Sequence, residues 1–167
     1  MEKVILIDKA NNPIGTEEKM KAHRDGKLHR AFSIFIFNDN RELMLQRRSL
    51  GKYHNGGIWT NTVCSHPRPD ETYQEAVHRR LQEEMGFDCE LKKKGCFIYK
   101  AKFDNGLTEH EYDCVFVGKY NNEPKLNPQE AMDWKWISLP DLKREINKNP
   151  NNYTFWMKEI LRKNILK

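Results

Sequence analysis

The chain has 167 residues, of which 38% are hydrophobic and 32% are charged, a composition typical of one globular domain over residues 1–167. No apolar run approaches the roughly 20 residues that cross a bilayer, and the N-terminus lacks the pattern of a signal peptide. We therefore expect a cytoplasmic protein with no membrane partner. The net charge of +5 lies partly in short clusters rather than in one continuous stripe, so we expect no nucleic-acid partner.

The four cysteines are scattered along the chain without a CxxC pair, at Cys64, Cys89, Cys96 and Cys114. This spacing indicates neither a disulfide framework nor a zinc knuckle. We expect all four to be reduced thiols.

Apolar runs separated by turn residues predict strands. These runs lie at Val4–Ile7, Phe32–Phe37, Leu43–Gln46, Ile58–Val63, Cys96–Phe103, Cys114–Val117 and Trp134–Ile137. Helical spacing and cap residues predict helices at Tyr73–Met85, from Ser138 to about Asn147, and at Thr154–Asn164. This order indicates an α+β domain in which helices flank a mixed or antiparallel sheet.

The predicted helix ending at Met85 places Arg80 and Glu84 on one row, because residues four apart share a face. On an arbitrary helix such a pair is more often a surface salt bridge than a site, since charged residues are usually solvated. The neighbouring residues favour a site here, as the following motif indicates.

The segment RRLQEEMGF resembles the end of a Nudix box, whose usual form is G-x5-E-x7-R-E-U-x-E-E-x-G-U with U apolar. The matching positions are Glu71, Arg79, Leu81, Glu83, Glu84, Gly86 and Phe87. Ser65 stands where the box begins with glycine, and Arg80 stands where the second box glutamate belongs. In Nudix hydrolases these glutamates hold magnesium against a diphosphate, so Arg80 predicts weaker hydrolysis and an added cation for phosphate.

Three imidazoles and two carboxylates form a second candidate group. His23 and His29 lie in KAHRDGKLHRAF, and His66 lies in CSH. Glu109 and Glu111 lie two apart in LTEHEYD, so on a strand they point to the same face. Any one of them alone is more often an ordinary surface or core residue, but the set suits an octahedral divalent cation with one position left for a ligand.

The whole constellation is similar to type I isopentenyl diphosphate isomerases, which are Nudix-fold enzymes. The resemblance rests on "AH" followed by a second histidine, "WTNTVCSHP", "RR" before "EMG", "YKA" and "EHE", in this order. It runs from about Ile5 to Trp156. It implies conversion of isopentenyl diphosphate to dimethylallyl diphosphate through a carbocation, for isoprenoid biosynthesis.

The resemblance implies a proton-transferring group on each side of the substrate. Glu111, assisted by Tyr99, is expected to protonate the terminal carbon, and the Cys64 thiolate to remove a proton from the carbon beside the diphosphate-bearing methylene. A nearby metal and basic residues would lower the pKa of Cys64. Trp156 matches the aromatic residue that stabilises the carbocation, although it also suits helix packing.

The resemblance also implies the binding residues. The expected ligands of one divalent cation, Mn²⁺, Zn²⁺ or Mg²⁺, are His23, His29, His66, Glu109 and Glu111. Glu84 is expected to contact a separate Mg²⁺ that arrives with the diphosphate. The diphosphate itself is expected to bind Lys19, Arg48, Lys52 and Arg80. The expected partner is this small isoprenoid diphosphate, and the protein is expected to be a monomer.

Two other functions remain open at this point. A Nudix hydrolase of a diphosphate substrate would use the same fold, but Arg80 and the His/Cys/Glu set argue against it. A basic RNA-binding module would fit the net charge, and its binding would weaken steeply with salt.

Overall fold

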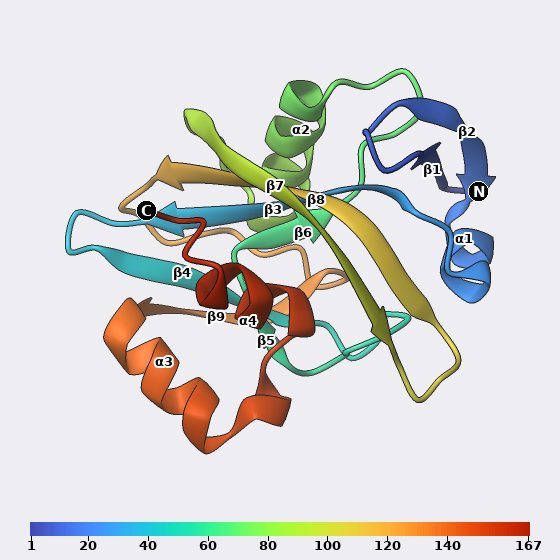
Figure 1. Cartoon of the computed structure of the whole chain (residues 1–167). Helices are drawn as coiled ribbons and strands as arrows, with labels where there is room; N and C mark the ends of the chain where they lie inside the picture. The colour runs from blue at the N-terminus through green and yellow to red at the C-terminus, as the bar shows by residue number, and fades with distance from the viewer.

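The structure is a computed structural model that describes all residues from Met1 to Lys167. Nine strands form one mixed sheet (Figure 1). Their bounds are β1 Lys3–Ile7, β2 Pro13–Glu18, β3 His29–Phe37, β4 Glu42–Arg48, β5 Trp59–Thr60, β6 Val63–Ser65, β7 Leu91–Lys102, β8 Thr108–Lys119 and β9 Ala131–Ser138. β3 is at the centre, because it pairs with β1, β4, β6 and β8, and its pairing with β8 is parallel.

Helices cover both faces of this sheet (Figure 1). They are α1 Lys19–Asp25, α2 Tyr73–Met85, α3 Leu139–Lys148 and α4 Phe155–Arg162, with a short 3₁₀ turn at Pro150–Asn152. α2 lies on one face, α4 lies on the other, and α1 lies beside β1 and β2 at one end. This arrangement confirms the predicted α+β class. No helix is long and apolar enough to cross a membrane.

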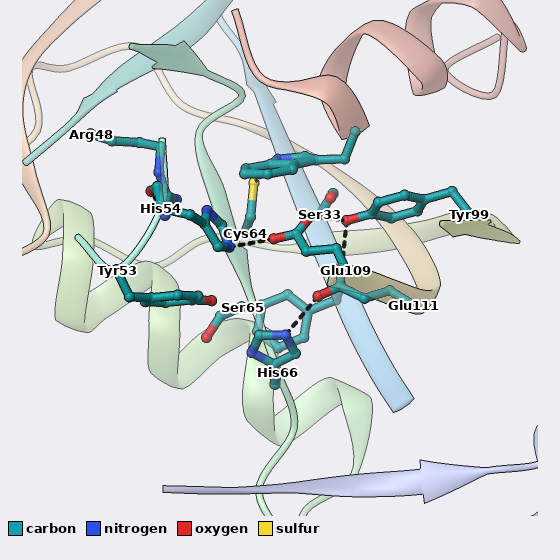
Figure 2. Close-up of a pocket in the computed structure, with 12 residues that line it drawn as sticks. Ser33, Arg48, Tyr53, His54, Cys64, Ser65, His66, Tyr99, Glu109 and Glu111 are labelled. Carbon is teal, nitrogen blue, oxygen red and sulfur yellow. Dashed lines mark hydrogen bonds and ion pairs between the residues drawn. The ribbon is translucent and has the colours of Figure 1, made fainter. Parts of the chain in front are cut away.

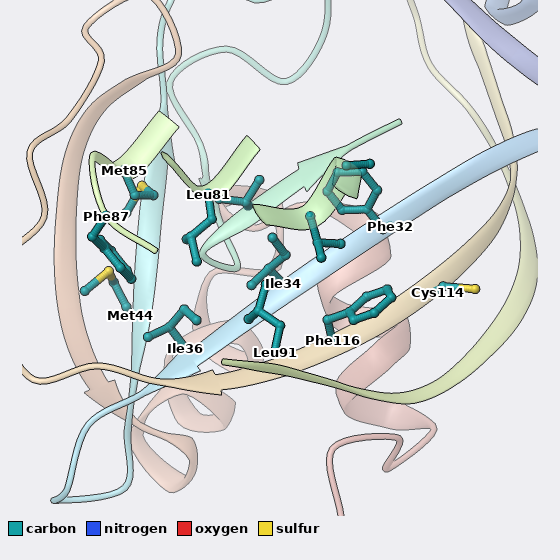
Figure 3. Close-up of a cluster of buried hydrophobic side chains, with 13 residues drawn as sticks. Phe32, Ile34, Ile36, Met44, Leu81, Met85, Phe87, Leu91, Cys114 and Phe116 are labelled. Atoms are coloured by element: carbon teal, nitrogen blue, oxygen red, sulfur yellow. The ribbon is translucent and has the colours of Figure 1, made fainter. Parts of the chain in front are cut away.

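Side chains of β3 alternate between the two faces, as its period of two requires. Phe32, Ile34 and Ile36 are buried with Leu81 and Met85 of α2 in one hydrophobic core (Figure 3). The alternate residues of β3, beginning with His29, point to the opposite face of the sheet, on the α4 side. The same strand therefore supplies both a core and one wall of the candidate site.

α2 forms where its sequence signals place it. A capping box joins Thr72 and Glu75 at its start. At its end Gly86 has φ 72°, which favours glycine. A Cβ on Gly86 would also lie 2.5 Å from the Lys125 carbonyl oxygen, so the close approach of the next loop requires glycine as well.

The prediction of one continuous strand at Ile58–Val63 is wrong, because the structure divides this segment between β5 and β6. Between them the Asn61 amide donates to the carbonyls of Ile34 and Val63, and the Thr62 hydroxyl donates to the carbonyl of Met44. The hydrogen bonds of these buried polar side chains replace backbone hydrogen bonds of the sheet, and the chain turns between the two strands. β2 and α1 were not predicted.

The cysteines also differ from the prediction. A disulfide joins Cys96 of β7 to Cys114 of β8, which lie directly opposite each other with Cα atoms 4.1 Å apart. Cys64 and Cys89 are free. The expectation of four reduced thiols is therefore wrong for one pair.

Candidate active site

Three buried imidazoles converge on one carboxylate. The Oε1 atom of Glu111 lies 2.8 Å from His66 Nε2, 3.4 Å from His29 Nε2 and 3.9 Å from His23 Nε2. The parallel register of β3 and β8 sets His29 opposite Glu111. The αL turn at Gly26, φ 63°, ends α1 and leads back into β3, so that the rings of His23 and His29 lie 4.8 Å apart.

Hydrogen bonds to backbone carbonyls fix the orientation and the tautomer of two of these rings. Nδ1–H of His23 donates to the Lys19 carbonyl at 2.7 Å, and Nδ1–H of His29 donates to the Lys27 carbonyl at 2.8 Å. Each Nε2 is then left with a lone pair directed toward the cluster. Burial lowers the pKa of His23 and lowers that of His66 to about 3, so both rings favour the neutral form that binds metals.

The cluster fits a divalent cation. The Nε2 atoms of His23 and His29 are buried and have no hydrogen-bond partner, which is costly for polar atoms unless a further partner satisfies them. Burial works to raise the pKa of Glu111, but its contacts with His29 and His66 outweigh this effect and hold the pKa well below the ordinary value. His23, His29, His66 and Glu111 offer ligand atoms that all lie within 4.8 Å of one another.

Glu109 lies beside this group and not within it. The Tyr99 hydroxyl is 2.7 Å from Glu109 Oε2 and 2.6 Å from Glu111 Oε2, so it bridges the two carboxylates (Figure 2). The other oxygen of Glu109 lies 2.6 Å from His54 Nε2. Of the five predicted ligands, the structure thus brings four together directly and connects the fifth through Tyr99.

Cys64 lies on the wall of the same cavity, on β6 (Figure 2). Its Sγ accepts from Nε1–H of Trp156 at 2.7 Å and donates to Asn61 Oδ1 at 3.0 Å. The cavity is also lined by Tyr99, Glu109, Glu111 and Arg48, and its volume is about 20 Å³. That is room for one water-sized molecule, so side chains must move to admit a diphosphate.

The lowered pKa expected for Cys64 depends on a bound metal beside the thiol. The burial of the side chain acts in the opposite direction. Burial raises the pKa of the thiol to about 12, and this effect exceeds the opposing effects of the Thr60 hydroxyl and the Arg48 charge. Among the chain's own groups, burial therefore favours the protonated thiol.

The four predicted diphosphate cations are not all in the cavity. Arg48 lines it, with its guanidinium carbon 5.4 Å from the Trp156 ring centre, and Lys19 lies 4.6 Å from the ring centre of Tyr53, another lining residue. Lys52 and Arg80 instead share one carboxylate, that of Glu130.

Glu84 belongs to the same polar network. Its Oε1 accepts from Arg80 Nη2 at 2.5 Å and its Oε2 accepts from Gln46 Nε2 at 2.9 Å. Neither Glu84 nor Arg80 lines the cavity. The structure therefore links Lys52, Arg80, Glu84 and Glu130 in one polar network, whereas Arg48 lines the cavity.

The Glu130 contacts predict a pH-dependent contribution to stability. Burial works to raise its pKa, but the charges of Arg80 and Lys52 prevail and lower it from 4.5 to about 2. A group whose pKa is lower in the folded than in the unfolded state stabilises the folded protein at pH values above its unfolded-state pKa. This stabilisation is lost as the pH falls through the folded-state pKa. Glu130→Gln should therefore lower the free energy of unfolding more at pH 7 than at pH 3 in urea titrations.

A matched control for this prediction is Glu123→Gln, at an exposed position without an ion pair among those of the structure. We expect little difference between the two pH values for that variant. An equal loss of stability at both pH values for Glu130→Gln would contradict the prediction.

The sequence patterns do not predict Tyr53, His54, Asp113 or Glu130 as residues of the site. Asp113 continues the row of Glu109 and Glu111 on one face of β8, and this alternation was a usable signal; it accepts from the Ser33 hydroxyl at 2.8 Å. Burial raises the pKa of Asp113 well above its ordinary value. His54 and Glu130 lie in loops, where no periodicity marks them.

Comparisons with known proteins agree with this geometry. A family model described as NUDIX domain matches residues 27–162. The chain is 54% identical over 160 residues to a protein of Aromatoleum aromaticum named isopentenyl-diphosphate Delta-isomerase 2, covering 96% of this chain and 85% of the relative. It is 51% identical to a protein of that name from Photorhabdus laumondii, covering 96% and 90%.

Solved structures show the same fold at lower identity. DR0079 from Deinococcus radiodurans has a TM-score of 0.83 at 20% identity, covering 97% of this chain and 98% of that one. A MutT protein from Methanosarcina mazei has a TM-score of 0.64 at 22% identity, covering 82% and 95%. The chain therefore belongs to the Nudix family and, within it, to the isopentenyl-diphosphate Delta-isomerases.

Proposed function

We propose that the protein converts isopentenyl diphosphate to dimethylallyl diphosphate for isoprenoid biosynthesis. The observation that carries this proposal is one small cavity lined by Cys64, Tyr99, Glu111 and Trp156, with His66 of the imidazole cluster in its wall. Metal-assisted hydrolysis of a diphosphate needs carboxylates around Mg²⁺, whereas a thiol, a phenol and an indole suit chemistry at carbon.

The reaction adds one proton and removes another. The π electrons of the terminal double bond form a new C–H bond, which leaves a tertiary carbocation. Loss of a proton from the carbon beside the diphosphate-bearing methylene then returns its C–H electron pair to a new double bond. No net proton is consumed, so two proton-transferring groups at different carbons are required.

Cys64 and the Glu111–Tyr99 pair are the two groups we assign to these steps. They line the same cavity from different strands, Cys64 from β6, Glu111 from β8 and Tyr99 from β7. We keep the assignment that the resemblance implies, in which Glu111 with Tyr99 protonates the terminal carbon and Cys64 removes the proton.

We assign Trp156 to the stabilisation of the carbocation. Its ring is 2% exposed and its Nε1–H is held by Cys64 Sγ and Thr60 Oγ1, at 2.7 and 3.1 Å. A fixed aromatic face stabilises a desolvated cation by roughly 2 kcal/mol. A buried indole also excludes the water that would trap the carbocation.

We assign the divalent cation to His23, His29, His66 and Glu111, with Glu109 as the further carboxylate of the set. A bound cation supplies positive charge next to the Glu111 carboxylate and fixes its position. The chain's own part is to hold the carboxylate in place through three imidazoles and the Tyr99 hydroxyl. The ion is Mn²⁺, Zn²⁺ or Mg²⁺.

The diphosphate is assigned to Arg48, Lys19, Lys52 and Arg80, with Mg²⁺ and Glu84 on the same side. In the structure Glu130 accepts from Lys52 and Arg80. A diphosphate is therefore proposed to replace the carboxylate as the partner of these two cations, which explains why a hydrolase glutamate is an arginine at position 80. We further propose that the protein works in the cytoplasm as a monomer.

The proposal is tested by incubating the protein with isopentenyl diphosphate and Mg²⁺ or Mn²⁺ and following products by NMR. We expect dimethylallyl diphosphate with the diphosphate intact. Release of phosphate without the isomer would favour the hydrolase alternative and overturn the proposal.

A further inference from the structure

His54 is a buried imidazole in the loop between β4 and β5, with a side chain only 2% exposed. Three aromatic neighbours fix the plane of its ring: Phe103 stacks at 5.0 Å, and Tyr53 and Trp156 contact its edge at 4.2 and 5.7 Å between ring centres. Its backbone carbonyl accepts from Arg48 Nη2 at 3.2 Å. The direction of the ring is thus set from several sides.

The Nε2 atom of His54 points into the site. It lies 2.6 Å from Glu109 Oε1 (Figure 2), yet Nε2 has no hydrogen bond of ordinary geometry. A buried ring nitrogen without an aligned partner is unfavourable. The same is true of His23 and His29, whose free Nε2 atoms belong to the cation cluster.

Donor atoms of His54, His23 and Glu109 form a second close group, within 4.8 Å of one another. Ligand atoms bound to one cation at about 2.1 Å are separated by up to about 4.2 Å. Within each group, a shift of a few tenths of an ångström in each side chain is enough to close this difference, and the donors of the two groups must approach one another further. His23 has only one free nitrogen, because Nδ1–H is bonded to Lys19, so both donor groups must serve the same ion.

We propose that His54 is a ligand of this ion, entering from the Glu109 side. The centre then has four imidazoles, from His23, His29, His54 and His66, and two carboxylates, from Glu109 and Glu111. At the opposite nitrogen, Asn55 Nδ2 lies 3.1 Å from His54 Nδ1. In the proposed centre the side-chain amide of Asn55 is turned, so that its oxygen accepts from Nδ1–H.

Two chemical consequences follow. Six protein donors leave no position for a substrate oxygen, so this cation acts on the reaction only through Glu109 and Glu111. A set with four imidazole nitrogens also favours a transition-series cation such as Zn²⁺ or Mn²⁺ over Mg²⁺, which prefers oxygen. This inference rests on the metal centre of the proposed function, but not on the identity of the substrate.

The experiment compares the wild type with His54→Ala and with a control, His78→Ala, which removes an imidazole on α2 far from the cluster. Each protein is stripped with chelator and reloaded with one equivalent of Mn²⁺, which takes six ligands in an octahedral centre. Affinity is measured by competition with a chromophoric chelator, and the number of bound imidazoles by X-ray absorption spectroscopy. His54→Gln, closer in size, is included in case the alanine variant does not fold cooperatively.

We expect four imidazoles in the wild type and in His78→Ala, three in the His54 variants, and a loss of affinity of at least roughly 10- to 100-fold in those variants. Three imidazoles in the wild type, or a spectrum unchanged by His54 replacement, would overturn the inference, even if affinity fell. Failure of the isomerase assay with these spectra intact would overturn the proposed function alone.

Discussion

Replacing Cys64 by alanine is expected to lower the rate of isomerisation by a factor of roughly 10²–10⁴, the usual contribution of one positioned acid or base. The thiol is the only proton-transferring group on its wall of the cavity that the mechanism uses, and Trp156 and Asn61 hold its sulfur. The loss should appear in kcat more than in KM, because the variant keeps all four cations that are assigned to the diphosphate. Steady-state rates with isopentenyl diphosphate measure both.

The matched control is Cys89→Ala, which removes the other free cysteine, at a half-buried position outside the cavity. We expect its rate to stay near that of the wild type. Circular dichroism of both variants excludes a folding defect. A folded Cys64→Ala variant with a wild-type kcat would rule out proton transfer by this thiol.

Exchanging Glu111 for glutamine should impair both metal binding and catalysis. Glutamine keeps the size of the side chain but removes the charge around which three imidazoles gather. We expect a loss of cation affinity of at least roughly 10- to 100-fold and a loss of rate of roughly 10²–10⁴-fold. Elemental analysis after dialysis and isomerase assays at saturating metal separate the two effects.

Chelation of the wild type provides the corresponding test without mutation. Activity should disappear with the ion and return with a divalent cation, and the melting temperature should fall, since a ligand at 100 times its Kd stabilises by about 2.7 kcal/mol. Glu90→Gln, an exposed change on the surface, is the control. Full activity after complete removal of the ion, or a Glu111→Gln variant as active as this control, would contradict the assignment.

Much of the fold could be predicted because its signals are local. The helix from Tyr73 to Met85 was found with its exact bounds, since its capping box, apolar spacing and terminal glycine agree. β2 was missed because its Pro-Ile-Gly-Thr-Glu-Glu sequence is largely exposed and lacks apolar alternation. α1 has only seven residues, too few for helical spacing to mark it.

The site could be predicted only in part, for a related reason. His23, His29, His66 and Glu111 do come together, as the resemblance implied. Cys64 lies where expected, but its pKa depends on burial, which the sequence does not display. Glu130 competes for two of the expected diphosphate cations across a separation of 50 residues or more, and no local pattern reports such a contact.

The short helix α1 couples the stability of one segment to the binding of the cation. A helix of seven residues is too short to persist by itself in water, yet it carries His23, whose orientation depends on the helical carbonyl of Lys19. A cation held by His23, His29 and Glu111 would cross-link this helix to β3 and β8. Fraying of α1 would open the coordination, so the exchange rate of the ion should be limited by the local opening of this one segment.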